Sequence, residues 1–150
     1  MKRLATFRVD DRSYGVDVAR VREVVRSLDV TPVPLAPADV AGLINLRGEI
    51  LTALDLRVRL GSAARADTRA MNLIMTSDHG PVSLLVDEAG DVVEVDDATF
   101  EPPPATLRGA ARDLIVGTYT VDERLLMELD VARTIDGTTP SGTDLEGEDR

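Results

Sequence analysis

The chain has 150 residues, of which 43% are hydrophobic, and its 17 basic and 27 acidic residues give a formal net charge of -10. This composition is typical of a globular protein with one or two small domains, and the negative charge disfavours binding to nucleic acids or anionic membrane surfaces. The chain contains no cysteine, which excludes disulfides, thiolate nucleophiles and sulfur-ligated metals. It also has no apolar run long enough for a membrane span or a signal peptide, so we expect a cytoplasmic protein without direct membrane insertion.

Two segments alternate apolar and polar residues around a polar turn, which predicts two β-hairpins. The first covers residues 4–18 and turns at residues 10–12, and the second covers residues 71–86 and turns at residues 77–80. The two segments align without a gap when Asp10 is placed on Asp78. Residues 18–25 follow the first hairpin with apolar side chains at helical spacing, so we expect a helical turn that leads into a further strand.

The apolar side chains of that turn and strand are candidates for a partner-binding surface. Val18, Val21 and Val24 lie on one face of the predicted turn, and Val92 occupies the position equivalent to Val24 in the second half. We expect these valines to form an aliphatic docking surface. The alternative is that they only cover the end of the core.

Residues 42–50, GLINLRGEI, are two apolar strand ends joined by a polar turn. Gly48 predicts a tight hairpin whose backbone needs positive φ, which glycine adopts without steric cost. Arg47 then lies at the tip and points outward, where its guanidinium can bind a carboxylate at two points or stay solvated. Arg47 is a candidate partner-binding residue on this ground, and Gly42, Asn45 and Gly48 of the same segment are named as candidates with it.

A second pair of segments, residues 51–60 and 126–135, also matches without a gap. This alignment places Asp55 on Asp130. Each aspartate follows an alternating strand and precedes a short helical pattern, which is where a carboxylate caps the first turn of a helix. We therefore expect structural roles for both aspartates.

The repeats together predict an all-β fold with short helices. Each half is expected to contain two strands, a short helical step, a strand, a long loop, two strands and a short helix. Five short strands are best closed into a small barrel, because an open sheet of that size leaves aggregation-prone edges. We expect two tandem, intertwined SH3-like barrels in residues 1–135, roughly 1–70 and 71–135. Residues 136–150 lose periodicity and are expected to be a disordered acidic tail, with a functional acidic peptide as the alternative.

The sequence offers little support for catalysis. Its single histidine, His79, lies in a predicted turn, and neither a zinc ligand set nor a phosphate-binding Gly-rich loop is present. The remaining option is paired carboxylates, at Asp10-Asp11, Asp87-Glu88 and Asp96-Asp97. Adjacent carboxylates at turns are typical of solvated charges, because acid–base catalysis needs one buried carboxyl group. We expect no catalytic residues, no metal, no cofactor and no small-molecule substrate.

The sequence resembles the CheW family of chemotaxis coupling proteins. The resemblance covers about residues 4–135. It includes Gly15, for which we expect a structural role. Its motifs are Tyr14-Gly15-Val16-Asp17-Val18, Val21-Arg22-Glu23-Val24, Pro32-Val33-Pro34, Gly42 to Ile50, Leu54-Asp55-Leu56-Arg57, Leu85-Val86-Asp87 and Gly117 to Leu129.

The resemblance implies two five-stranded barrels without catalytic activity. It implies a cytoplasmic adaptor at receptor arrays that binds the hairpin tip of a chemoreceptor and the regulatory domain of the CheA histidine kinase. Within the family, the residues equivalent to Arg47 and Glu23 matter for coupling, so Arg47 is expected to face Glu23 at a partner groove. The alternatives are a CheW-like scaffold in another two-component pathway, such as surface motility or gene regulation, and a small acidic hydrolase.

Overall fold

The computed structural model describes residues 1–26, 28–63 and 70–136. This part of the chain is mostly β. Its strands are β1 (Lys2–Val9), β2 (Arg12–Asp17), β3 (Val21–Val25), β4 (Val40–Leu46), β5 (Glu49–Asp55), β6 (Met71–Met75), β7 (Val82–Val86), β8 (Glu88–Val95), β9 (Ile115–Val121) and β10 (Arg124–Leu129). Its helical segments are η1 (Val18–Arg20), α1 (Leu56–Arg59), η2 (Asp97–Thr99), α2 (Gly109–Leu114) and α3 (Val131–Asp136). None of these helices is long and apolar enough to cross a membrane.

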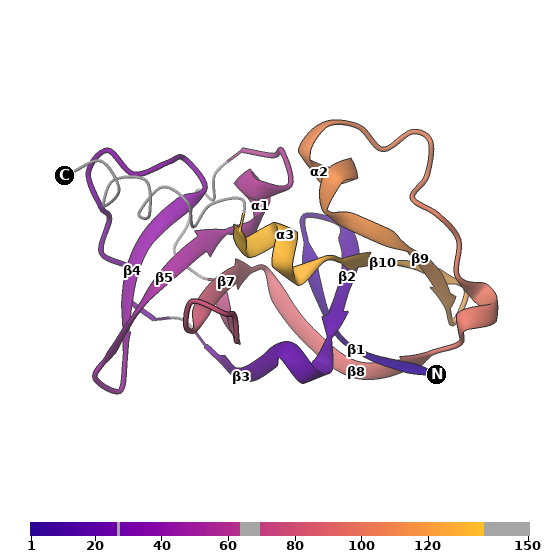
Figure 1. Cartoon of the computed structure of the whole chain (residues 1–150), viewed down its shortest axis with the longest axis horizontal. Coiled ribbons are helices and arrows are strands. Elements are labelled where there is room, and N and C mark those ends of the chain that lie inside the picture. The colour runs from indigo at the N-terminus through magenta and orange to yellow at the C-terminus, as the bar shows by residue number, and fades with distance from the viewer. Residues whose placement is uncertain (27, 64–69, 137–150) are drawn as a thin grey trace.

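The strands form two five-stranded sheets that lie side by side (Figure 1). One sheet has the order β8-β1-β2-β10-β9 and the other has the order β3-β6-β7-β5-β4. Each sheet takes strands from both halves of the chain, because β8 pairs with β1 and β3 pairs with β6. Residue 70 therefore marks the boundary between the two sequence repeats but not a boundary between the two sheets. Each sheet contains strands from both sides of it.

The two halves share most of their element order, as the repeat predicts, but they differ at the helical step and in the long loop, which contains η2 and α2 in the second half only. In the first half η1 separates β2 from β3, and the Asp17 carboxylate accepts a 3.0 Å hydrogen bond from the Ala19 amide at its start. In the second half β7 ends at Val86 and β8 begins at Glu88, so the expected helical step is missing. The alignment of the two hairpins places Leu85 on Asp17, and leucine has no side-chain oxygen to cap a helical turn.

The largest apolar core joins the two sheets. Phe7 and Tyr14 of the first hairpin contribute stacked rings with centroids 5.8 Å apart, and Leu73 and Met75 of β6 belong to the same cluster. Ile74, between them in sequence, belongs to a second cluster formed with β4 and β5. Because successive side chains of a strand point to opposite faces, β6 is buried on both faces. The run Leu73-Ile74-Met75 therefore departs from the alternation expected for residues 71–86, because a strand buried on both faces needs no polar side.

In each sheet a backbone bridge pairs a connecting segment with an edge strand. The segment after β3 pairs with β4, where the amides of Thr31 and Leu43 each donate a 2.8 Å hydrogen bond to the other's carbonyl. The segment after β8 and η2 pairs with β9, where Glu101 and Thr118 exchange hydrogen bonds of 2.9 and 2.8 Å. Each bridge covers part of the free side of its edge strand.

A glycine makes each bridge possible. A Cβ atom added to Gly42, whose φ is +150°, would lie 2.2 Å from the carbonyl oxygen of Thr31. A Cβ atom added to Gly117 would lie 2.3 Å from the Phe100 ring and 2.7 Å from the Glu101 carbonyl oxygen. The alignment that places Asp55 on Asp130 also places Gly42 on Gly117. The two glycines thus hold equivalent structural positions in the two sheets.

The two aspartates of the repeat lie at the starts of short helices. Asp55 is the N-cap of α1, and its Oδ1 accepts a 3.1 Å hydrogen bond from the Arg57 amide. Asp130 precedes α3, and its Oδ1 accepts a 3.0 Å hydrogen bond from the Arg133 amide. Each carboxylate satisfies an amide that has no partner within its helix.

Replacing Asp55 by alanine is expected to lower the free energy of unfolding by about 1 to 2 kcal/mol, because the capping oxygen is lost. Asp55→Asn retains an oxygen at the same position and should cost clearly less. Urea unfolding of the two variants measures the difference. Equal losses in both variants would mean that the carboxylate acts through its charge rather than as a cap.

Candidate functional site

The β4–β5 hairpin presents Arg47 at its tip. Arg47 has φ of 52° and Gly48 has φ of 90°, so both residues of the two-residue turn adopt positive φ, where only glycine was expected to do so. This is the geometry of a turn whose twist matches that of the flanking strands. Asn45 stabilises the turn locally, because its Oδ1 accepts a 2.8 Å hydrogen bond from the Gly48 amide.

Arg47 faces Glu23 of β3. Its Nη2 lies 2.5 Å from the Glu23 Oε2, the Arg47 side chain is 64% exposed, and the Glu23 side chain is 29% exposed. A second ion pair lies beside the first, where Arg22 Nη1 is 3.2 Å from Glu49 Oε1. These four residues, Arg47, Glu23, Arg22 and Glu49, form a charge cluster with no net charge. Solvent screening makes such exposed pairs weak contributors to stability, so their charges remain free to act in recognition.

The ion pair spans the two edges of one sheet. Glu23 belongs to β3 at one edge, and Arg47 belongs to the hairpin of β4 at the opposite edge. The chain between these strands also lies against β4, because Thr31 pairs with Leu43.

The predicted aliphatic residues divide into two groups. Val18 and Val21 are partly buried and pack against the core that joins the sheets, so they also serve the fold. Val24 and Val92 are each 45% exposed. Val24 is opposite Leu73 in its strand pair and Val92 is opposite Ala5, and both partners belong to that core. Because opposite residues of an antiparallel pair lie on the same face, Val24 and Val92 are exposed on the core-facing sides of the edge strands β3 and β8.

Two other predicted residues have structural explanations. Gly42 was expected to bind a partner, but the close approach of Thr31 already requires a glycine there. Gly15 is buried in β2, and an added Cβ atom would lie 3.1 Å from the Leu4 side chain.

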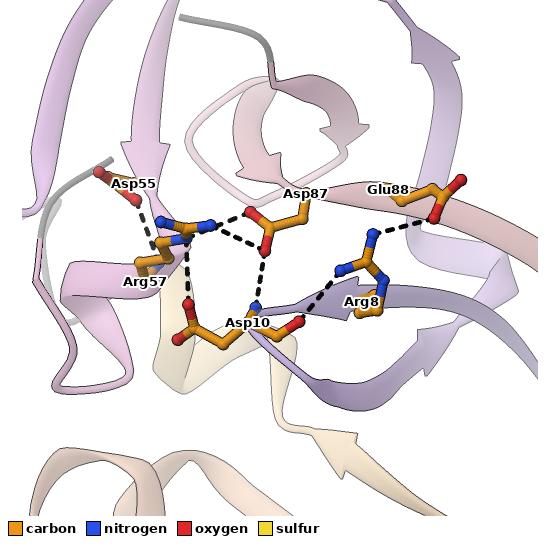
Figure 2. A network of polar contacts seen from close by, with 6 residues as sticks. All are labelled: Arg8, Asp10, Asp55, Arg57, Asp87 and Glu88. Carbon is orange, nitrogen blue, oxygen red and sulfur yellow. Dashed lines mark hydrogen bonds and ion pairs between the residues drawn. The ribbon is translucent and has the colours of Figure 1, made fainter. Parts of the chain in front are cut away.

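A network of charges joins the two sheets at α1 (Figure 2). Arg57 Nε and Nη2 lie 3.2 and 3.1 Å from the two carboxylate oxygens of Asp87, which is a bidentate contact, and Nε lies 3.3 Å from Asp10 Oδ1. Asp87 Oδ2 also accepts a 2.7 Å hydrogen bond from the Asp10 amide. The Asp87 side chain is only 8% exposed. The hydrogen bonds between Arg57 and Asp87 raise the pKa of the Arg57 guanidinium above its usual range.

Removing the Arg57 charge is expected to destabilise the protein. Arg57→Met leaves the Asp87 carboxylate buried without its cation, which typically costs about 3 kcal/mol or more. Asp87→Asn in the same chain removes that charge and should recover a large part of the loss. Chemical denaturation of the single and double variants measures the coupling between the two residues. If the double variant lost the sum of the stability losses of the two single variants, Arg57 and Asp87 would not stabilise the protein as a pair.

At least one carboxylate of each pair considered for catalysis is engaged in structure. Asp10 and Asp87 belong to the Arg57 network, and Asp96 caps η2 by accepting a 2.9 Å hydrogen bond from the Ala98 amide. His79 lies in the β6–β7 turn, where its amide donates to Ser77 Oγ. Within residues 1–26, 28–63 and 70–136, no group of three or more His, Cys, Asp or Glu side chains is arranged to hold a metal ion.

Comparison with known proteins identifies the family. Residues 3–138 match the family model of the CheW-like domain. The chain belongs to the CheW family. The likeness to this family inferred from the sequence motifs is therefore confirmed.

Curated relatives and a solved structure agree with the CheW assignment. The chain is 36% identical to chemotaxis protein CheW of Rhizobium meliloti over 132 residues, which is 86% of this chain and 85% of the relative. It is 31% identical to protein FrzA of Myxococcus xanthus over 110 residues, which is 73% of this chain and 69% of that protein. The crystal structure of the scaffolding protein TtCheW from Thermoanaerobacter tengcongensis superposes with a TM-score of 0.77 at 28% identity, covering 89% of this chain and 91% of TtCheW. The fold class expected from the sequence is confirmed.

Two features of this CheW-like chain were missed in the sequence. The contact between Arg57 and Asp87 was not expected: Arg57 was named only as a family motif residue, and Asp87 only as a motif residue and as half of the carboxylate pair Asp87-Glu88. Their opposite charges were the one signal that they could pair. Gly117 was not singled out, yet the alignment of Asp55 with Asp130 places it on Gly42, so the repeat could have revealed it.

Proposed function

We propose that this chain is a non-enzymatic adaptor that couples chemoreceptors to a CheA-type histidine kinase in chemotaxis. It binds the cytoplasmic hairpin tip of the receptor and the regulatory domain of the kinase. The observation that carries the proposal is the exposed ion pair between Arg47 and Glu23. These are the two residues to which the family resemblance assigns coupling, and they meet on a chain that matches the CheW-like domain from residue 3 to 138.

The surface chemistry supports recognition of a protein partner. Val24 and Val92 offer exposed aliphatic area, and Val18 and Val21 precede Val24 in the chain and are only partly buried against the core. Burial of aliphatic side chains supplies affinity, whereas rim charges such as Arg47 fix orientation and reject wrong partners. The proposed contact therefore has an apolar centre and a charged margin.

A second candidate function is a CheW-like scaffold in another two-component pathway, such as surface motility or gene regulation. It is favoured by the likeness to FrzA, whose name differs from that of the chemotaxis proteins. Both candidates use the same fold, and they differ in the receptor and kinase that are bound.

The proposal is tested by measuring binding of the purified chain to a receptor cytoplasmic fragment and to a CheA regulatory domain. Val24→Asp and Val92→Asp should each weaken at least one of the two complexes by about tenfold, which corresponds to about 1.4 kcal/mol. Val116→Asp is the matched control, because Val116 is 41% exposed on β9 and lies outside the proposed surface.

Raising the salt concentration should change these affinities less than either aspartate substitution does, because screening acts on the rim charges and not on the apolar centre. Binding of neither partner would refute the coupling function. An equal effect of Val116→Asp would refute the assigned surface while leaving the function in place.

A further inference from the structure

A groove with three arginines lies on the side of the molecule that carries α2. Its volume is about 710 Å³, and it is bounded by the β1–β2 turn, the end of α1, the chain leading into α2 and the start of β10. We call it the arginine groove and define it by Arg12, Arg108, Arg124, Leu60, Leu107 and Leu125. It shares none of these residues with the Arg47–Glu23 site.

The charges of the arginine groove are unbalanced. Its lining contains three arginines and one acidic residue, Asp11. Arg108 and Arg124 form no ion pair with any other residue in the described ranges of the chain. Uncompensated arginines beside low-dielectric walls concentrate positive potential and attract carboxylates. The groove therefore fits an anionic occupant.

The groove also has an apolar component. Leu60 and Leu107 are buried in its walls, whereas Leu125 is 52% exposed. A ligand that carries only charge would leave the Leu125 side chain in contact with water. An acidic segment with an apolar side chain among its carboxylates would use both features of the groove.

The C-terminal segment of this chain has that composition. Residues 144–149 read Asp-Leu-Glu-Gly-Glu-Asp, so Leu145 is flanked by Asp144 and Glu146. Residues 137–150 contain four acidic residues and one arginine, a net charge of 1 minus 4, or -3. This pattern is complementary to an exposed leucine among arginines.

The described chain ends next to α1, and the residue that follows α1 lines the groove. α3 ends at Asp136, and Arg59 donates hydrogen bonds of 3.1 and 3.0 Å to the carbonyls of Thr134 and Arg133. The residue after Arg59 is Leu60, which lines the groove. Seven residues separate Asp136 from Asp144, and an extended chain of that length spans up to roughly 25 Å. The acidic segment is therefore within reach of the arginines.

We propose that residues 144–149 of this chain bind in the arginine groove, with their carboxylates on Arg108 and Arg124 and Leu145 against Leu125. The occupant is the chain's own acidic segment. A short tether gives an effective concentration of about 1 mM, so even a site with a dissociation constant near 1 mM would be about half occupied. The groove would then be open to another acidic segment only when that segment competes with the chain's own.

The proposal is tested on the full chain by paramagnetic relaxation enhancement. The chain has no cysteine, so Ser141→Cys provides a unique site for a nitroxide label. Amide signals of Arg108, Arg124 and Leu125 should lose about half or more of their intensity, consistent with half occupancy. The same loss should vanish in Arg108→Glu/Arg124→Glu and should persist in Arg26→Glu. Arg26 is the control because it is an exposed arginine directly after β3, a strand of the other sheet.

Three results would overturn the proposal. The first is full intensity of the groove amides in the labelled chain, and the second is unchanged broadening in Arg108→Glu/Arg124→Glu. The third result uses a mixture of ¹⁵N chain without nitroxide and ¹⁴N chain with nitroxide. If the groove amides broaden in this mixture as much as in the nitroxide-labelled ¹⁵N chain alone, the occupant is the segment of a second copy. Increasing the salt to about 1 M, where charges are screened beyond about 3 Å, should restore much of the signal if carboxylates hold the segment.

Discussion

Gly42→Ala is expected to lower the free energy of unfolding by about 3 kcal/mol or more. The added Cβ atom would lie 2.2 Å from the Thr31 carbonyl oxygen, which is a backbone atom and cannot rotate away. The chain must then give up the Thr31–Leu43 bridge or strain the backbone, and overpacking and forced positive φ each cost about 1 to 3 kcal/mol. Because the bridge pairs Leu43 of the edge strand β4, its loss also leaves the amide and carbonyl of Leu43 without these partners.

Gly48→Ala separates the steric clash of an added Cβ atom from the cost of positive φ. Gly48 also has positive φ, but an added Cβ atom there would meet no atom within 4 Å. Its substitution should cost only about 1 kcal/mol, the conformational penalty alone. Urea unfolding gives the difference, and amide hydrogen exchange at Thr31 and Leu43 reports whether the bridge has opened. Equal losses for Gly42→Ala and Gly48→Ala, with unchanged exchange, would refute the role of Gly42 in the Thr31–Leu43 bridge.

Arg47→Glu and Glu23→Arg are each expected to abolish coupling of receptor to kinase while leaving the fold intact. Both side chains are exposed enough that their ion pair contributes only about 0 to 1 kcal/mol to stability. At an interface the same reversal places like charges opposite a partner, which costs several kcal/mol and lowers the association rate. The measurement is kinase autophosphorylation in a reconstituted mixture with receptor, and circular dichroism checks the fold.

The double variant Arg47→Glu/Glu23→Arg shows how the pair acts. Partial recovery would mean that the two residues mainly orient each other, and no recovery would mean that each contacts the partner separately. Glu88→Arg is the control, because Glu88 forms a comparable exposed pair with Arg8 at 3.0 Å outside the proposed surface. Normal coupling in both single variants would refute the proposed role of this site.

The elements of the fold were predictable because their signals are local. The two hairpins follow from alternation within a few residues, and the caps at Asp55 and Asp130 follow from an aspartate between a strand and a helical pattern. The turn at Arg47 follows from the glycine after it. The outward position of Arg47 depends on the turn alone, so the sequence also predicted the exposed tip of the candidate site.

The partners of those elements were decided by tertiary structure. Both halves carry similar strands. The apolar–polar pattern of β3 is compatible with pairing to a strand of its own half and with the observed pairing to β6 of the other half. The observed pairing depends on the path of the whole chain, as do the contact of Arg57 with Asp87 and the approach of Thr31 to Gly42. Side-chain periodicity states which face of a strand is buried, but it does not state against which strand. The sequence by itself therefore determined the strands, the caps at Asp55 and Asp130 and the turns, although not α2 or the absence of a helical step before β8. Only the tertiary structure determined the intertwined sheets and the contacts between distant charges.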